Sequence, residues 1–184
     1  MKVIGMVPIV ENRLYSIVYD DAEDGVFDLL FEQWSDVNYL VEFFSRHTEY
    51  TENKFWKGMD NDPERAALSV IEDASELEPC LIELAENANE EEHPDLDDFF
   101  DYLEGDYKYV IRHVPMKGYG MKNPSLIRLY AIKMETNVYI IVYGGIKLKK
   151  TIQDSPILKD EVLRRINAVM LFMKENGIID KEDI

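Results

Sequence analysis

The sequence predicts an α+β protein in which helices pack against a small antiparallel sheet. Between residues 24 and 103, apolar residues recur at three- and four-residue spacing, which is typical of amphipathic helices. Residues 1–20 and 107–150 are instead rich in β-branched and aromatic residues bounded by turn dipeptides, which is typical of strands. With 184 residues, 46% of them hydrophobic, the chain is long enough to bury one core, so we expect a single domain over 1–184.

Residues 1–20 are expected to form two short N-terminal strands joined at Glu11-Asn12. Pro8 lies within the first of them. Because proline cannot donate a hydrogen bond to a neighbouring strand, Pro8 favours an edge position for this strand.

Residues 21–106 form an acidic section that is expected to be helical. Helical spacing runs from Asp24 to about Tyr50, with Ser35-Asp36 marking either the cap of a second helix or a kink. Asp62-Pro63-Glu64 supplies a cap, a first-turn proline and a first-turn acid, which predicts a helix from 63 to about 77. Pro79 is expected to break or restart this helix. His93-Pro94 and Gly105 bracket a further short helix.

Residues 107–184 are expected to form a basic β-meander followed by a helix. The predicted strands are 107–114, 126–134 and 138–150, and the last two are separated by the hairpin-length Glu135-Thr136-Asn137. A terminal helix should begin at Ser155-Pro156 and end at Asn176-Gly177. We expect its apolar stripe to pack on the sheet, with Ile166, Val169, Met170 and Met173 against Ile132, Ile140 or Val142.

Charge is distributed very unevenly along the chain. The net charge is −17, but residues 1–106 carry 6 Lys and Arg against 29 Asp and Glu. Residues 107–150 carry 9 basic side chains against the single acid Glu135, a local charge of +8. Because like charge opposes approach to phosphate, any nucleic-acid chemistry is expected to belong to this basic segment.

The expected location is the cytoplasm. The single cysteine, Cys80, excludes an intramolecular disulfide framework and a Cys-based zinc site. The chain shows no charged leader followed by a long apolar run. Its longest uncharged apolar stretch, Val138 to Ile146, is less than half of a membrane span, so we expect no membrane partner.

No metal site and no cofactor are expected. Asp60, Asp62 and Glu64 have the alternate spacing of a calcium loop, but Arg65 and Ile71 stand where that loop needs glycine and glutamate. A run of acids at 95, 97, 98 and 101 is more typical of a solvated helix face than of a cation site. The three histidines have no second ligand at helical spacing.

Two glycine-containing stretches in the basic segment are candidate ligand contacts. In KGYGMK (117–122), two glycines let the backbone approach a ligand, Lys117 and Lys122 supply charge, and Tyr119 offers a stacking face. An ordinary mobile loop explains the same stretch. Gly144-Gly145 is either a bulge that redirects the lysines that follow it or a twist in a long strand.

Strand alternation divides the cations of the paired strands. It places Arg128 and Tyr130 on one face and Lys133 on the other. A charged strand edge that resists aggregation is the alternative explanation of these cations.

The stretch SLIRLYAIKMETNVYIIVYGGIKLKKT (125–151) resembles the RelE/ParE toxin superfamily, in particular its HigB-like branch and related phage proteins. The shared pattern is an arginine-containing strand, a second hydrophobic strand, a glycine, and a lysine pair followed by threonine. The resemblance covers the C-terminal part of the chain. It implies a RelE-like core into which a long acidic helical section is inserted.

The resemblance also implies a toxin-type protein acting on RNA or the ribosome, possessing an antitoxin or another protein partner. Its chemistry would be metal-independent cleavage of mRNA by 2′-hydroxyl attack, or a degenerate form without activity. Cationic side chains would stabilise the developing phosphate charge. The implied catalytic residues are Arg128, Tyr130 and Lys149, and the implied RNA or phosphate contacts are Lys117, Tyr119, Lys122, Lys147 and Lys150.

A second hypothesis is a non-catalytic acidic interaction protein. Here residues 1–106 bind a basic partner, and the sheet serves as a scaffold. Under the first hypothesis the acidic section is a partner surface, a clamp over the basic face, or a sign that nuclease activity has been lost. The sequence leaves these alternatives open.

Overall fold

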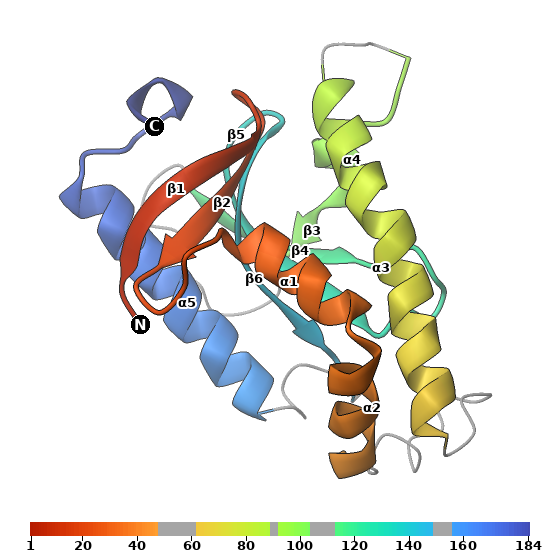
Figure 1. Cartoon of the computed structure of the whole chain (residues 1–184). Coiled ribbons are helices and arrows are strands. Elements are labelled where there is room, and N and C mark those ends of the chain that lie inside the picture. Colours follow the sequence, from red (N-terminus) through yellow and green to blue (C-terminus); the bar gives the residue numbers. More distant parts are fainter. Residues whose placement is uncertain (48–61, 89–91, 104–112, 149–155) are drawn as a thin grey trace.

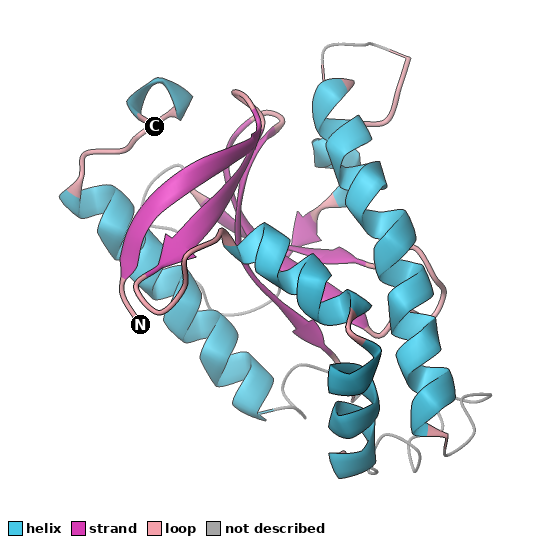
Figure 2. Ribbon diagram, viewed as in Figure 1, coloured by secondary structure: helices cyan, strands magenta, loops and turns pink. Residues whose placement is uncertain are grey.

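The computed structural model describes residues 1–47, 62–88, 92–103, 113–148 and 156–184. The elements in these ranges are β1 (Val3–Val10), β2 (Leu14–Tyr19), α1 (Val26–Ser35), α2 (Val37–Arg46), α3 (Pro63–Glu86), α4 (Leu96–Phe99), β3 (Asp101–Tyr102), β4 (Val114–Tyr119), β5 (Ile127–Glu135), β6 (Val138–Ile146), α5 (Pro156–Glu175) and the 3-10 turn η3 (Lys181–Asp183). They form an α+β fold, as predicted, with one six-stranded sheet in the order β1-β2-β6-β5-β4-β3 (Figures 1 and 2).

The N-terminal hairpin has the predicted strands and turn. Its two strands pair antiparallel, and Asn12 lies in the turn between them with a φ of 60°, a left-handed conformation that asparagine tolerates better than most residues. Strand β1 is at one edge of the sheet, so Pro8 occupies the edge position that the sequence indicates.

The acidic section contains two short helices and one long one. Asp36 separates α1 from α2 and caps α2, because its carboxylate accepts hydrogen bonds from the backbone N–H groups of Asn38 and Tyr39. Asp62 caps α3 in the same way. Ser35-Asp36 therefore marks a second helix.

The predicted break at Pro79 is wrong, since α3 continues through it to Glu86. Proline in a helix interior costs about 3 kcal/mol because it removes one hydrogen bond and crowds the preceding turn. Pro79 lies on the exposed side of α3, whereas Leu77, Leu81 and Ala85 are buried on the opposite side. Burial of this apolar side before and after the proline offsets the local cost.

The short helix after Pro94 ends earlier than predicted. It stops at Phe99, and Asp101–Tyr102 instead forms strand β3, which pairs antiparallel with Lys117 and Met116 of β4. The backbone groups of this segment are thus satisfied by the sheet.

The predicted strand over 107–114 falls mostly on residues outside the described ranges. Within the described residues, strand β4 begins at Val114 and includes Lys117, Gly118 and Tyr119, which the sequence places in a loop. Gly118 is needed for close packing: a Cβ there would lie 2.3 Å from Cε1 of Phe99.

The meander β4-β5-β6 is confirmed, but the sheet as a whole is mixed. Strand β2 pairs parallel with β6, with Leu14, Tyr15 and Ser16 opposite Tyr139, Ile140 and Ile141. Local alternation predicts hairpins because their strands are neighbours in sequence. The parallel pair joins segments more than a hundred residues apart, so the hairpin signals do not indicate it.

Two adjacent glycines show that β6 is covered on both faces. A Cβ on Gly144 would meet Leu30 and Trp34 of α1, whereas one on Gly145 would meet Leu158 of α5. Neighbouring strand residues point to opposite faces, so α1 and α5 lie on opposite sides of the sheet. In the view of Figure 1, α1 lies in front of the sheet and α5 passes behind β1 and β2.

The terminal helix packs on the sheet as predicted. Helix α5 contacts β1, β5 and β6, and it buries Val162, Ile166, Val169 and Met173. Its end is also as predicted, because Gly177 follows the helix with a φ of +71°.

The irregularity in β6 lies at Val142 rather than at the glycine pair. Tyr130 faces Tyr143 and Ala131 faces Ile141, which leaves Val142 as the extra residue of a bulge. Its carbonyl oxygen accepts a hydrogen bond from the hydroxyl of Tyr19, at 3.0 Å. The bulge therefore helps to join the meander to the N-terminal hairpin.

No helix in the described part of the chain is both long enough and apolar enough to cross a bilayer.

Replacing Gly144 by alanine is expected to lower the free energy of unfolding by about 1–3 kcal/mol, because the new Cβ overpacks the contact with α1. It would lie 2.6 Å from Leu30 Cδ1 and 2.9 Å from Trp34 Cη2. The matched control is Gly145→Ala, whose Cβ meets the flexible end of Leu158 at 3.1 Å, and we expect a change within about 0.5 kcal/mol. Urea denaturation of both variants measures this, and equal losses would contradict tight packing of α1 on β6.

Candidate functional site

The structure describes six of the eight residues that the sequence singles out for RNA chemistry. These are Lys117, Tyr119, Lys122, Arg128, Tyr130 and Lys147. The other two, Lys149 and Lys150, lie outside the described residues, and so their predicted roles stay predictions.

Strand register brings four of the six together on one face. Lys117 is directly opposite Tyr130, and Tyr119 is directly opposite Arg128, on the antiparallel strands β4 and β5. Side chains opposite each other in such a pair project to the same face. Lys133 lies on the other face, where it bonds Asp97 of α4, as strand alternation predicts.

Tyr130 is enclosed within this face. It is 2% exposed, and its ring stacks on that of Tyr143 at a centroid distance of 6.3 Å. In this arrangement the Tyr130 hydroxyl does not face solvent, and a role in base stacking or proton transfer would require the surrounding side chains to move.

Arg128 is a nearly buried cation held by one of its nitrogens. The side chain is 7% exposed, and Nη1 donates hydrogen bonds to the carbonyl oxygens of Ser125, at 2.8 Å, and Ile127, at 2.6 Å. Burial lowers the pKa of Arg128 from its usual value, while the field of Asp73 acts in the opposite direction. A guanidinium nevertheless stays protonated at neutral pH.

The other edge of the guanidinium, formed by Nε and Nη2, makes no hydrogen bond or ion pair with any residue in the described ranges. This edge is the one that binds carboxylate or phosphate in a bidentate manner.

Tyr119 covers the guanidinium and is itself half-exposed. Its ring centroid lies 4.4 Å from Cζ of Arg128 and 5.8 Å from Nζ of Lys117, so both cations lie within range of its π-system. With 36% of its surface exposed, the ring also presents area to solvent. We call Lys117, Tyr119 and Arg128 the Tyr119–Arg128 site.

Of the other two predicted lysines in the described ranges, Lys122 is paired with the acidic section. The Lys122 ammonium is bonded to Glu72 of α3, and its backbone N–H donates to Asp73. Lys147 follows β6, and its backbone N–H donates to the carbonyl oxygen of Leu126 at 2.8 Å.

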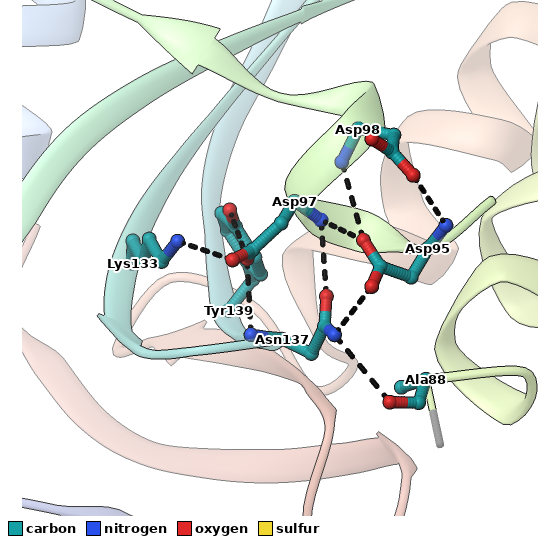
Figure 3. Close-up of polar contacts among 7 residues, drawn as sticks. All are labelled: Ala88, Asp95, Asp97, Asp98, Lys133, Asn137 and Tyr139. Atoms are coloured by element: carbon teal, nitrogen blue, oxygen red, sulfur yellow. Dashed lines mark hydrogen bonds and ion pairs between the residues drawn. The ribbon is translucent and has the colours of Figure 1, made fainter. Parts of the chain in front are cut away.

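A second polar cluster includes part of the acidic run at 95–101 that was weighed as a cation site, and it joins α4 to the β5–β6 hairpin. Figure 3 shows Asp97 of α4 beside the β5–β6 turn: it accepts hydrogen bonds from the Lys133 ammonium, the Asn137 backbone and the Tyr139 hydroxyl at 2.6, 3.0 and 2.8 Å. Asn137 has a φ of 56° and donates through Nδ2 to Asp95, the cap of α4. These contacts fix the hairpin to the start of α4.

The described residues contain no group of three or more His, Cys, Asp or Glu side chains arranged to hold a metal ion. The aspartates of the predicted acidic run at 95, 97 and 98 serve instead as helix caps and hydrogen-bond acceptors.

The third cluster lies under α5 and was not predicted. The Arg165 guanidinium lies between two rings, 4.6 Å from the centroid of Tyr19 and 4.6 Å from that of Tyr143, and it bonds Glu161 at 2.6 Å. Burial raises the pKa of Tyr19 to about 12 even though Arg165 opposes this shift. Arg165 adjoins the apolar stripe of α5 in sequence, so helical spacing gave no signal for this contact.

Comparison of the chain with models of protein families, with curated proteins and with solved structures finds no match. The resemblance to the RelE/ParE superfamily thus remains a prediction that rests on residues 125–151.

The contacts of Asp97 predict that the free energy of unfolding decreases in acid. Burial by itself would raise the pKa of Asp97, but the hydrogen bonds from Lys133, Asn137 and Tyr139 together outweigh it and lower that pKa. A carboxylate with a lowered folded-state pKa stabilises the fold above its unfolded value, near 4, and this stabilisation is lost as the pH falls through the folded value.

Asp97→Asn should therefore lower the urea midpoint at pH 7, and the difference from wild type should shrink as the pH falls from about 5 to 3. Urea titrations at several pH values measure it. Asp21→Asn, which removes an exposed carboxylate from the turn after β2, is the control. A gap between Asp97→Asn and wild type that stays constant with pH would show that the carboxylate charge contributes nothing.

Proposed function

We propose that the protein is a RelE-like, toxin-type protein that acts on RNA, and that the Tyr119–Arg128 site contacts the RNA backbone and one base. The resemblance of residues 125–151 supports the class. The contacts of Arg128 support the location.

The single observation that carries the proposal is the bidentate edge of Arg128. The side chain is 7% exposed, yet Nε and Nη2 have no partner among the described residues. Burying a charged group whose donors lack acceptors is costly, by several kcal/mol for an isolated ion. A phosphate group that receives both donors would offset this cost, and its geometry fits the guanidinium fork.

Tyr119 supports a nucleic-acid ligand rather than an isolated anion. A half-exposed ring next to a phosphate-binding cation can stack on a base of single-stranded RNA, because every base has a π-face. Lys117 adds positive charge on the same face. Asp101 is its cross-strand neighbour on β3, which limits the local potential.

If the protein cleaves RNA, Arg128 is the described residue best suited to stabilise the developing phosphate charge. A preorganised cation in a water-poor environment is worth more than the same cation in solution. Lys149 and Lys150 retain the roles that the resemblance implies. Tyr119 replaces Tyr130 in our proposal as the aromatic ring that meets the base, because of its exposure.

The acidic section supports the second candidate, a non-catalytic protein that binds a basic partner. On α3, the acidic residues Glu64, Glu72, Glu76, Glu83 and Glu86 are all exposed, and Asp28 and Glu32 are exposed on α1. In this alternative, the cations of the meander neutralise part of the acidic section, as in the pairs Lys122–Glu72 and Lys133–Asp97.

Tyr119→Ala is expected to weaken binding of a short single-stranded oligoribonucleotide roughly tenfold, because one stacked base contributes about 1–3 kcal/mol. Tyr119→Phe keeps the ring and should bind like wild type. Fluorescence anisotropy with a labelled oligonucleotide measures both, and circular dichroism checks the fold. No binding by folded wild type at low salt would refute the proposal and favour the second candidate.

Lys117→Ala should reduce the slope of log affinity against log salt concentration by about 1, because one fewer counterion is released from the RNA. Lys174→Ala, an exposed lysine at the end of α5, is the control and should leave the slope unchanged. The measurement is the same anisotropy titration at four salt concentrations. An identical slope for both variants would place the RNA away from Lys117.

Cleavage is tested by induced expression. Growth arrest with transcript cleavage is expected for wild type, with relief in Arg128→Lys, which keeps the charge but loses the fork. An inert wild-type protein at full soluble expression would remove the nuclease part of the proposal.

A further inference from the structure

We propose that Asp73 is a positioning residue for Arg128: it holds the β4–β5 connection, residues 120–126, in the conformation that presents the guanidinium to phosphate. Asp73 lies on α3, in the acidic section, and no sequence pattern assigns it a role. The inference rests on the proposed function, since it takes phosphate as the ligand of Arg128.

The Asp73 carboxylate contacts the connection at three points. It is 1% exposed; Oδ1 accepts a hydrogen bond from the backbone N–H of Lys122 at 2.9 Å, and Oδ2 accepts one from Ser125 Oγ at 2.6 Å. A Cβ on Gly120 would lie 2.2 Å from Oδ2, so the carboxylate also lies directly against the backbone there. One buried carboxylate thus contacts the connection near both ends and in the middle.

Ser125 transmits this constraint to Arg128. Its carbonyl oxygen accepts the 2.8 Å hydrogen bond from Nη1, and its Oγ accepts one from the backbone N–H of Ile127 at 3.0 Å. At the other end, Tyr119 immediately precedes Gly120 and stacks on the same guanidinium. Both members of the stacked pair therefore flank a segment that Asp73 holds.

The Asp73 carboxylate does not occupy the Nε–Nη2 edge of Arg128. Asp73 makes no ion pair with Arg128, although its field partly opposes the lowering of the Arg128 pKa by burial. A direct bidentate pair would occupy Nε and Nη2, the donors that a phosphate needs. Glu72, one residue earlier, takes the ammonium of Lys122 at the surface. Glu72 and Asp73 thus both bind the connection, and neither forms an ion pair with Arg128.

The test compares Asp73→Ala with Glu72→Gln in the full chain. Both remove one negative charge from α3, but only the first releases Ser125. The readout without ligand is the Nε–Hε signal of Arg128 in a ¹⁵N-labelled sample, assigned by its absence in Arg128→Lys. We expect Asp73→Ala to move this signal toward that of a solvated arginine and to speed its exchange with water by roughly tenfold, whereas Glu72→Gln leaves it unchanged.

The readout with ligand is the affinity for inorganic phosphate and for the oligoribonucleotide. Asp73→Ala is expected to weaken both roughly tenfold, and Glu72→Gln to leave them equal or slightly tighter. If Asp73→Ala does not fold, Ser125→Ala removes the same tie and should shift the Arg128 signal in the same direction.

An unchanged Arg128 signal in folded Asp73→Ala would overturn the inference, and so would tighter phosphate binding by both α3 variants, because charge alone would then explain the effect. Failure of wild type to bind phosphate or RNA would instead refute the proposed function. In that case, the ligand-free signal still decides whether Asp73 positions Arg128.

Discussion

Strand β6 must be buried on both faces, and this constraint shapes most of the molecule. Gly144 admits α1 on one side, while Tyr143 and Gly145 face α5 on the other. The parallel pairing of β2 with β6 then joins the N-terminal hairpin to the meander in a single sheet. A strand covered on both sides leaves little room for solvent, so polar groups near it need partners within the fold.

The acidic section supplies partners for several polar groups of the meander. Glu72 binds Lys122, Asp97 binds Lys133, and Asp73 holds the connection that leads to Arg128. The acidic and basic parts of the chain are therefore not independent modules, because acids on α3 and α4 hold the meander in place. At longer range the same acids lower the positive potential that a polyanion would meet.

The Tyr119–Arg128 site lies on β4 and β5, and its Tyr119 ring is partly exposed. Helix α5 packs against β1, β5 and β6, and the half-exposed Tyr119 is on β4, beyond these strands. Arg128 is on β5 next to it, anchored through Nη1 to the backbone. Such a fixed cation loses little freedom when it binds a ligand, which is the physical advantage of a preorganised site.

The sequence by itself determined where the helices begin, the two hairpins and the terminal helix, because these depend on spacing and turn chemistry between near neighbours. The Asp62 cap, the Asn12 and Asn137 turns and Gly177 were readable in this way, whereas Ser35-Asp36 was compatible with either a cap or a kink. Alternation also correctly separated Arg128 from Lys133. The predicted break at Pro79 overestimated the local cost of a proline, because burial of the helix before and after Pro79 outweighs that cost.

Tertiary structure alone decided the rest. The parallel β2–β6 pair and the Arg165 contacts with Tyr19 and Tyr143 join residues far apart in the chain, and no local pattern encodes such distances. The same holds for the candidate site: residue type suggested Arg128 and Tyr119, but burial separated the half-exposed Tyr119 from the enclosed Tyr130. No sequence pattern singles out Asp73; packing places it under the β4–β5 connection, since a helix pattern says which side is buried but not what it meets.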